Sequence, residues 1–464
     1  MGIFKAYDVR GIYQQNLFEK NAYLLGYYFI KYTNLKKIKL ARDYRLSGSN
    51  LTKFFILGVL KANAKVEYQG QISTVNFYHS LFEGVNSGVV VTASHNDKEY
   101  NGFKFIVNGV SFDMRNGLGE VEKLVDENLD CLDYEEQEEF LTLPFEEFLL
   151  KFEIIENKKS LANYISFLYK FLNNIFSRKD LEILKSIKFS LDYSSGMSGM
   201  ALVSLFNKLS FSNINHYNFM PDGNFPIHSP DPLKAQRFLE EQKNLGEFVG
   251  VFDGDGDRIC FYNKNANVIS QDKVIFKYIE EFSKFGNKFV VDLRVSKNIF
   301  DLAQDKKLNV EKLRVGRAFY QDYMKENDCF FGAELSGHLF FKEFTYLDNP
   351  DIALIYMLKF VLDNLKEVGL ENFNFENILS HFSNYFKLQE INLKVKDADL
   401  CLNKLEKEFS NSIVSKMDGI SFDLGNIWFN VRKSNTEPII RINLEGNTQE
   451  EVIAFRERLE KLLN

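Results

Sequence analysis

Three stretches of the chain decide its fold class: IKLARDYRLSG at 38–48, IKFSLDYSSGMSG at 187–199 and KFVVDLRVSKNIF at 288–300. Each begins with a short apolar run that reaches an aspartate, then enters a polar turn, and continues with apolar residues at helical spacing. This order is typical of a strand followed by a helix in an α/β sheet. The likeness of the three stretches predicts three related α/β domains.

The C-terminal part of the chain has a different pattern. Apolar and polar residues alternate over 427–431 and over 440–444, which predicts two strands flanking the turn KSNTEP at 433–438. Thr448 and Glu451 form a capping box, and the apolar residues that follow share one face of a helix. These signals predict a small α+β domain.

An acidic cluster at 135–139 reads as a solvated face or a connecting segment and places a boundary near residue 148. The α+β domain is expected to start near residue 367. We therefore expect domains at 1–148, 149–262, 263–366 and 367–464.

Composition limits the class of protein. Of 464 residues, 45% are hydrophobic and 26% are charged, which is ordinary for folded globular domains. The net charge of −7 and the lack of a dense basic run argue against a nucleic-acid ligand. No uncharged apolar run approaches the ~20 residues of a bilayer span, and the four cysteines lack metal-site or disulfide spacing. We expect a cytoplasmic protein with no nucleic-acid or membrane partner.

The string DGDGDR, which follows the apolar run FVGVF, predicts a metal site. Residues two apart in an extended loop project to the same side, so Asp253, Asp255 and Asp257 can converge, while the two glycines let the backbone bend around an ion. Three carboxylates with no nearby His or Cys favour Mg²⁺ before Ca²⁺. An EF-hand would need Gly and Glu where this chain has Arg258 and Lys264. The alternative is an acidic surface turn.

The string GAELSGH at 332–338 is a candidate sugar site. Glu334, Ser336 and His338 are spaced by two, so a carboxylate, a hydroxyl and an imidazole can face one ligand. A polar strand edge with a capped turn is the alternative interpretation.

Two arginine-containing turns are candidate anion sites. In VRKSNTEP, Arg432 offers a planar fork for a phosphate, and Ser434, Asn435 and Thr436 offer further donors. An ordinary hairpin loop is the alternative. In KAYDVRG, Arg10 is explained equally well by a ligand contact or by a surface salt bridge.

The string VTASHNDKEYNGFKF places Ser94 in a polar turn after GVVV, either as a reactive hydroxyl or as a turn former. The hydrolase pattern G-x-S-x-G is missing there and around Ser336, and no Walker A string exists for nucleotide phosphates. Ser94 lies beside His95 and upstream of Lys104, in a chain with a predicted Mg²⁺ loop and a predicted phosphate loop. Phosphoryl transfer through the serine oxygen is therefore the leading interpretation.

This combination resembles the α-D-phosphohexomutase family, specifically the bacterial phosphomannomutase/phosphoglucomutase group. The matching strings occur in order over nearly the whole chain: KAYDVRG, TASHNDKEYNGFK, DGNFPIHSPDP, DGDGDR, GAELSGH and RKSNTEP. The resemblance implies four domains around a central cleft, three related α/β domains with mixed sheets and a C-terminal α+β domain. It implies an intramolecular phosphotransferase, a monomer or weak dimer, that interconverts the 1-phosphate and 6-phosphate of mannose, glucose or both. The route passes through a phosphoserine and a hexose 1,6-bisphosphate, which also serves as activator.

The resemblance implies roles for the matched residues. Ser94 carries the transferable phosphoryl group, and one phosphoserine oxygen joins the three aspartates in holding Mg²⁺. Arg10, Lys104 and His338 flank the reacting oxygens. The implied catalytic residues are Ser94, Arg10, His95 and Lys104; the metal ligands are Asp253, Asp255, Asp257 and Ser94; the substrate-binding residues are Arg258, Arg294, Arg317, Glu334, Ser336, His338, Arg432, Ser434, Asn435 and Thr436.

The chain departs from the family pattern at three positions. Asp97 stands where proline usually follows Ser-His-Asn, and Arg294 and Arg317 stand where the family more often has Lys and His. The Glu-Leu-Ser-Gly-His string resembles the Glu-Met-Ser-Gly-His of mannose/glucose enzymes more than the Glu-Gln-Ser-Gly-His of glucosamine mutases. Phosphoglucosamine mutase is one alternative function. The other is a non-catalytic sugar-phosphate binding protein, which would be expected to have lost Ser94 or one of the three aspartates.

Overall fold

The three repeated stretches form matching turns in the computed structural model, which describes residues 2–129, 139–380, 382, 385–395, 397–433 and 439–463. Asp43, Asp192 and Asp292 each accept a hydrogen bond at Oδ1 from the backbone N–H two residues further on, at 3.0, 2.9 and 3.0 Å. In this Asx-turn the aspartate side chain satisfies a backbone N–H that is no longer paired in the strand. The three stretches therefore share local structure as well as sequence order.

The chain divides into two compact units. One comprises Met1–Ile269 and Gly337–Phe375, and the other comprises Ser270–Ser336 and Glu376–Asn464. Most of the acidic cluster at 135–139 lies outside the described residues. Over the described residues, no helix combines the length and the apolar character that a membrane span requires.

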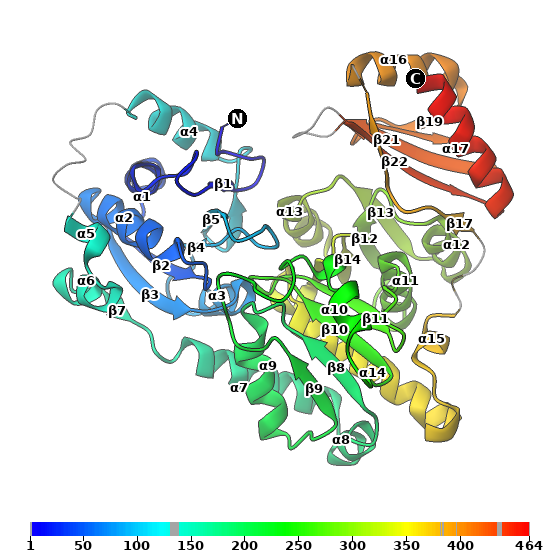
Figure 1. Ribbon diagram of the computed structural model, residues 1–464, viewed down its shortest axis with the longest axis horizontal. Coiled ribbons are helices and arrows are strands. Elements are labelled where there is room, and N and C mark those ends of the chain that lie inside the picture. The colour runs from blue at the N-terminus through cyan, green and yellow to red at the C-terminus, as the bar shows by residue number, and fades with distance from the viewer. Residues whose placement is uncertain are drawn as a thin grey trace. The chain divides into compact units, whose positions relative to one another are not determined.

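The first unit begins with a mixed sheet and its helices (Figure 1). The sheet has the order β1-β5-β4-β2-β3-β7, with β6 beside β5. The pairs β2–β3 and β2–β4 are parallel, whereas β5 runs antiparallel to β4 and β1. All four residues of β4 are buried, which explains its unbroken apolar sequence GVVV. The elements are β1 (Val9–Ile12), α1 (Glu19–Thr33), β2 (Lys37–Arg42), α2 (Gly48–Lys61), β3 (Lys65–Gln71), α3 (Thr74–Ser80), β4 (Gly88–Val91), β5 (Tyr100–Val107), β6 (Val110–Phe112), α4 (Leu118–Glu127), α5 (Glu139–Thr142), α6 (Phe145–Lys151) and β7 (Ile155–Glu156).

A second mixed sheet in this unit presents the DGDGDR loop. Its order is β11-β10-β8-β9, with β8 parallel to β9 and β10, and with β10 and β11 antiparallel. Every residue of β10 is buried, and the loop that joins β10 to β11 is Asp253–Arg258. The elements are α7 (Ser160–Ile175), α8 (Arg178–Leu184), β8 (Phe189–Asp192), α9 (Ser198–Lys208), β9 (Ile214–Tyr217), α10 (Gln236–Glu240), β10 (Phe248–Phe252) and β11 (Ile259–Asn263). After residue 337 the unit adds α14 (Pro350–Val368) and the antiparallel strands β15 (Leu339–Phe341) and β16 (Leu347–Asp348), which are not part of this sheet.

The second unit begins with a parallel arrangement in which β12 pairs with both β13 and β14. Its central strand, β12, is buried over four of its five residues and ends at Asp292. The elements are α11 (Gln271–Phe282), β12 (Lys288–Asp292), α12 (Lys297–Lys306), β13 (Asn309–Leu313), α13 (Arg317–Asn327) and β14 (Phe331–Ala333).

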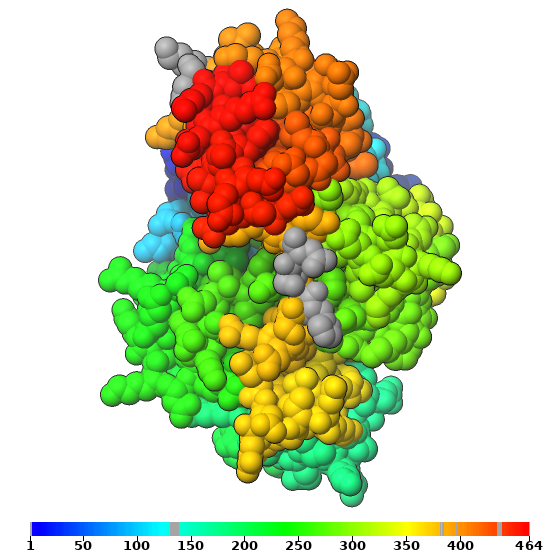
Figure 2. Space-filling model, turned by 90° about the vertical axis from the view of Figure 1, so that its right-hand side faces the viewer, coloured from blue at the N-terminus to red at the C-terminus, as the bar shows by residue number. Residues whose placement is uncertain are grey.

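The second unit ends with an antiparallel sheet in the order β17-β22-β21-β20-β19, with β18 also paired to β22. The predicted strands at 427–431 and 440–444 are confirmed, and the predicted helix begins one residue after Thr448. That helix, α17, lies on the surface of the domain (red in Figure 2) and buries Val452 and Leu459 against the sheet. The elements are β17 (Phe386–Lys387), β18 (Ile391–Lys394), α16 (Ala398–Glu408), β19 (Ile413–Ser415), β20 (Ile420–Asp423), β21 (Ile427–Lys433), β22 (Ile439–Gly446) and α17 (Gln449–Leu463).

The predicted fold class is confirmed, with mixed or parallel α/β structure in three regions and an α+β domain at the C-terminus. The domain boundaries at 148, 262 and 366 stay predictions.

Candidate active site

Ser94 occupies the turn between β4 and β5 in a strained conformation. Its φ of 52° lies in the left-handed region, which a serine rarely adopts, and the residue is only 1% exposed. The backbone N–H donates to Thr92 Oγ1 at 3.0 Å, and the hydroxyl donates to Asp253 Oδ2 at 3.0 Å. Ser94 Oγ also lies 3.3 Å from His95 Nδ1. The turn therefore aims the serine oxygen at the DGDGDR loop.

Arg45 holds this turn in place, and the sequence interpretation did not single it out. Its Nη2 donates to the carbonyl oxygens of Ser94 and Asn96 at 2.8 and 2.6 Å, and its Nη1 donates to two further carbonyls of the turn at 2.8 and 3.0 Å. Its Nε donates to Asp43 Oδ2 at 3.1 Å, and the residue is 1% exposed. A buried guanidinium with this many carbonyl partners fixes the backbone rather than binding a ligand. The available signal was an arginine two residues after Asp43, the aspartate that directly follows β2.

The carboxylates of DGDGDR converge as predicted from their spacing. One oxygen from each of Asp253, Asp255 and Asp257 lies within 4.8 Å of the others, and all three residues are buried. Asp253 Oδ1 accepts hydrogen bonds from three backbone N–H groups of the loop, those of Gly256, Asp257 and Arg258, at 3.0, 3.0 and 3.2 Å. The backbone of the loop thus folds around the Asp253 carboxylate, and the carboxylates of Asp255 and Asp257 lie beside it.

Two residues of the first sheet region meet this loop. Lys104 Nζ on β5 donates to Asp255 Oδ2 at 2.6 Å and to Asp257 Oδ2 at 2.5 Å. Thr74 Oγ1, at the start of α3, donates to Asp255 Oδ2 at 2.6 Å. The predicted residue Lys104 therefore belongs to the same buried cluster as the aspartates, and Thr74 is an addition that sequence reasoning missed.

The charges of this cluster fit a divalent cation. Burial, together with the neighbouring Asp257 and Asp255, raises the pKa of Asp253 well above its usual range. Asp255 Oδ1 is buried and has no hydrogen-bond partner among the described residues. A bound cation would relieve both conditions, because it ligates free carboxylate oxygens and favours their charged form. The residues present therefore fit a metal site of the Mg²⁺ type.

His338 and Arg258 lie beside the aspartates in the same unit. His338 Nδ1 is 2.6 Å from Asp348 Oδ2 and 3.8 Å from Asp257 Oδ1, while Arg258 Nε donates to His338 Nε2 at 2.9 Å. Since Nε2 accepts from Arg258, the neutral imidazole carries its proton on Nδ1 and donates it to Asp348. Asp348, on β16, was not predicted and fixes the orientation of the histidine.

Arg10 and His95 complete the neighbourhood of Ser94. Arg10 Nη1 donates to Asn96 Oδ1 at 2.7 Å, and its Nη2 pairs with Asp8. The positive charge of Arg258, followed by burial, holds the pKa of His95 well below its usual range. His95 is therefore neutral at pH 7 and can accept a hydrogen bond at its unprotonated ring nitrogen.

In the second unit, Glu334 connects the GAELSGH loop to the residue before Arg317. Its Oε1 accepts a hydrogen bond from the backbone N–H of Gly316 at 2.7 Å, and its Oε2 accepts one from Ser336 Oγ at 3.0 Å. Gly316 directly precedes Arg317, the first residue of α13. The carboxylate therefore fixes the Arg317 turn relative to the GAELSGH loop.

Arg294 and Arg432 also come together in the second unit. Both contact the carboxylate of Glu390, at 3.4 and 3.3 Å. Arg294 is clamped by Asp292, whose Oδ1 accepts from Arg294 Nε at 2.8 Å. The remaining predicted residues of this loop, Ser434, Asn435 and Thr436, lie outside the described residues.

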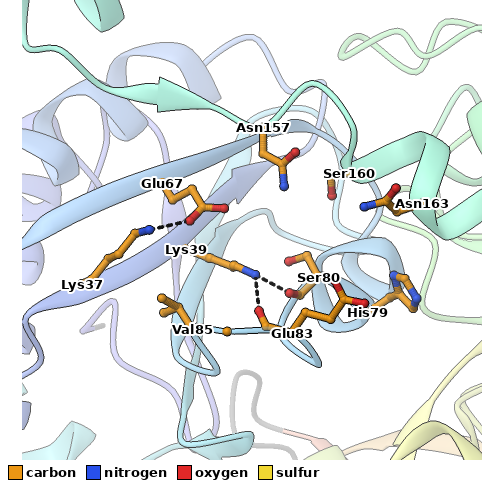
Figure 3. Close-up of a pocket in the computed structure, with 11 residues that line it drawn as sticks. Lys37, Lys39, Glu67, His79, Ser80, Glu83, Val85, Asn157, Ser160 and Asn163 are labelled. Carbon is orange, nitrogen blue, oxygen red and sulfur yellow. Dashed lines mark hydrogen bonds and ion pairs between the residues drawn. The ribbon is translucent and has the colours of Figure 1, made fainter.

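A cavity of about 350 Å³ lies elsewhere in the first unit, at the start of β2 and so at the opposite end of that strand from Asp43 (Figure 3). Lys37 Nζ pairs with Glu67 at 2.7 Å, and Lys39 Nζ donates to the carbonyl oxygens of Ser80 and Glu83 at 2.5 and 2.9 Å. The two lysines of this cavity are engaged within the protein, so it is a poor candidate for a phosphate site.

Comparison with known proteins gives one consistent family. The phosphoglucomutase/phosphomannomutase models match domain I at residues 1–128, domain II at 162–266, domain III at 272–370 and the C-terminal domain at 390–462. A phosphomannomutase of Methanocaldococcus jannaschii is 35% identical, over 100% of this chain and 97% of its own. A phosphomannomutase/phosphoglucomutase of Pseudomonas syringae is 27% identical, over 97% and 92%. A crystal structure of a family protein from Burkholderia thailandensis superposes with a TM-score of 0.76 at 22% identity, over 99% and 96%.

Fold, site and relatives together define a phosphohexomutase, an intramolecular phosphotransferase. The chain belongs to the phosphoglucomutase/phosphomannomutase family.

Proposed function

We propose that this phosphohexomutase interconverts hexose 1-phosphates and hexose 6-phosphates through a phosphoserine at position 94, with mannose, glucose or both as the sugar. The observation that carries the proposal is the buried Ser94 hydroxyl, held 3.0 Å from Asp253 in a loop of three carboxylates. A serine in a strained turn beside a cation site is suited to accept and release a phosphoryl group.

Mg²⁺ is the proposed ion, held by Asp253, Asp255, Asp257 and one phosphoserine oxygen. When all three carboxylates are ionised, they outnumber the cations Lys104 and Arg258, and a phosphoserine adds about −1.5 to −2 to this negative charge. When bound, the ion offsets this charge and polarises the transferring phosphoryl group.

The transfer is a balanced exchange of one P–O bond for another. The bond from phosphorus to Ser94 Oγ breaks while a sugar hydroxyl oxygen forms its own bond to phosphorus and releases its proton, and Ser94 Oγ takes up a proton to become a hydroxyl again. The reverse step returns the other phosphate of the resulting 1,6-bisphosphate to the serine. In the first unit His95 contacts Ser94 Oγ, Arg10 contacts Asn96 of the same turn, and Lys104 contacts Asp255 of the metal loop. Positioning with charge neutralisation supplies most of the catalysis. A free hexose 1,6-bisphosphate acts as activator because it can phosphorylate Ser94 directly.

The phosphate that is not being transferred binds to the arginines of the second unit. Arg294 and Arg432 both contact the carboxylate of Glu390, and Ser434, Asn435 and Thr436 follow Arg432 in the chain. Glu334, Ser336, His338 and Arg317 are proposed for the sugar hydroxyls, and Arg258 for the phosphate near the metal. Since either phosphate must occupy the holding site in turn, the bisphosphate has to reorient between the two transfers.

Sugar preference is tested by initial rates on mannose 1-phosphate, glucose 1-phosphate and glucosamine 1-phosphate, measured side by side with a trace of the matching bisphosphate. We expect mannose 1-phosphate or glucose 1-phosphate to give the highest kcat/KM. The relatives reported above carry those two sugars in their names, and Leu335 keeps GAELSGH close to the mannose/glucose form. A higher kcat/KM on glucosamine 1-phosphate would favour the phosphoglucosamine mutase alternative instead.

Arg432→Ala is expected to weaken binding of both the 1-phosphate and the 6-phosphate by about 10- to 100-fold, because a hydrogen bond to a charged group contributes about 1.5–3 kcal/mol. Arg432→Lys should restore the charge and only part of the affinity. Isothermal titration with each phosphosugar measures the effect. Loss of binding for one isomer with unchanged binding of the other would contradict a single shared holding site.

A further inference from the structure

Glu390, the residue before β18, places one carboxylate among three arginines and an asparagine. Its Oε2 accepts from Asn443 Nδ2 at 3.2 Å, Arg432 Nη2 at 3.3 Å and Arg294 Nη1 at 3.4 Å, and its Oε1 accepts from Arg441 Nη1 at 3.5 Å. These partners come from three segments, namely the turn after β12, β21 and β22. One side chain therefore links the region of β12 to the C-terminal sheet.

The negative charge of Glu390 lies beside two arginines that would otherwise repel each other. Arg432 and Arg441 lie directly opposite each other in the β21–β22 pair. Like charges in that position destabilise a sheet unless an anion lies between them. Burial disfavours the charged form of Glu390, but Arg432 and Arg294 outweigh that effect and lower the pKa of its carboxyl. Glu390 is thus the anion that lets the two cross-strand arginines share one face of the sheet.

Glu390 does not use all the hydrogen-bond donors of the arginines around it. The Nε atoms of Arg432 and Arg441 are buried and have no hydrogen-bond partner among the described residues. All four contacts to Glu390 are longer than the ~2.7–2.9 Å of close charge-assisted hydrogen bonds. Among the described residues, these three guanidinium groups outnumber the two carboxylates that pair with them directly, those of Glu390 and Asp292. The arginines therefore keep both charge and donors for a second anion.

We propose that Glu390 is a positioning residue of the phosphate-holding site, which orients Arg432, Arg441 and Arg294 toward the phosphate that is not being transferred. The proposal rests on the function proposed above, in which Arg432 binds that phosphate. It adds Arg441 to the site and makes the orientation of all three arginines depend on one carboxylate.

Glu390→Gln tests this role, because glutamine keeps the shape of the side chain and loses its charge. Glucose 1-phosphate binding is measured by isothermal titration in a Ser94→Ala background, where turnover does not interfere. We expect the Kd to rise about 10-fold, the order of effect of one lost charge-assisted contact. In the enzyme that keeps Ser94, KM should rise by a similar factor while kcat changes less. The reason is that the holding site binds the phosphate equally in the ground state and in the transition state.

Glu408→Gln is the matched control. Glu408 lies in the same domain, and its carboxylate pairs with Arg458 at 2.8 Å on the surface. This variant should leave Kd, KM and kcat unchanged. An unchanged or lower Kd in Glu390→Gln would overturn the proposal, since a lower value would mean that Glu390 competes with the phosphate.

A double-mutant cycle separates positioning from general stability. If Glu390 acts in part through Arg432, then Glu390→Gln in an Arg432→Ala background should raise the Kd by a smaller factor than it does when Arg432 is present, whereas fully additive effects would overturn the proposal. If Glu390→Gln proves unfolded by circular dichroism, Glu390→Asp takes its place in the same cycle and must weaken binding more when Arg432 is present than when it is absent. Should Arg432→Ala itself leave binding unchanged, the assignment of the holding site fails, and that outcome is distinct from failure of Glu390 alone.

Discussion

Ser94→Ala is expected to abolish turnover, with kcat reduced on the order of 10³-fold or more, because removal of a nucleophile leaves only binding and electrostatic effects. Intact-protein mass spectrometry after incubation with glucose 1,6-bisphosphate should find one added phosphoryl group on the unmodified enzyme and none on the variant. The burial of Ser94 and its contact with Asp253 motivate this expectation.

Ser204→Ala is the control for this experiment. Ser204 is an exposed serine of α9 whose hydroxyl donates to the carbonyl oxygen of Met200, at 3.1 Å. It should keep full activity and full phosphorylation. A phosphoryl group that persists in Ser94→Ala, or a rate close to that of the unmodified enzyme, would show that another residue carries the phosphate.

The convergence of the three aspartates could be predicted from the sequence, whereas the residues that support the candidate site could not. Asp253, Asp255 and Asp257 were predictable because their spacing alone brings carboxylates to one side of a short loop. The strands at 427–431 and 440–444 were predictable because a sheet with one buried face alternates apolar and polar residues. In both cases the deciding interactions lie close together along the chain.

The supporting residues were not predictable in the same way. Arg45 acts on carbonyl groups about 50 residues away, and Glu390 acts on arginines 42 to 96 residues away. No spacing rule connects such positions, since the contact exists only after the strands have assembled. His338 was predicted as a ligand of the sugar, yet its orientation is set by Asp348, a buried carboxylate in the two-residue strand β16. Its role toward the sugar stays a prediction.

Removal of Mg²⁺ by a chelator is expected to abolish activity, and added Mg²⁺ should restore it. Asp255→Asn should raise the Mg²⁺ concentration needed for half-maximal activity at least about 100-fold, because even residues that only orient a metal ligand contribute 10- to 100-fold in affinity. Asp255 is the sharpest position to change, since its Oδ1 has no partner among the described residues while its Oδ2 already accepts from Lys104 and Thr74. Full activity in excess chelator would contradict a metal requirement.

Asp363→Asn provides the matched control, because Asp363 is an exposed aspartate of α14 paired with Lys359. The same loss of one carboxylate charge there should leave the Mg²⁺ requirement unchanged. A shift equal to that of Asp255→Asn would mean that net charge, rather than ligation, sets the response to Mg²⁺.

Thermal unfolding gives a measurement of the metal site that does not depend on turnover. An ion that binds only the folded state adds about 2.7 kcal/mol to the free energy of unfolding when its free concentration is 100 times its Kd. We therefore expect Mg²⁺ to raise the Tm of the unmodified enzyme, of Ser94→Ala and of Asp363→Asn, but to raise that of Asp255→Asn much less. In Asp255→Asn the crowding of carboxylates around Asp253 is also reduced, so the variant should be no less stable than the unmodified enzyme in chelator. A Mg²⁺-dependent rise in Tm that survives in Asp255→Asn would place the ion elsewhere, whereas its loss in Ser94→Ala would mean that the unphosphorylated serine oxygen is itself required for the ion to bind.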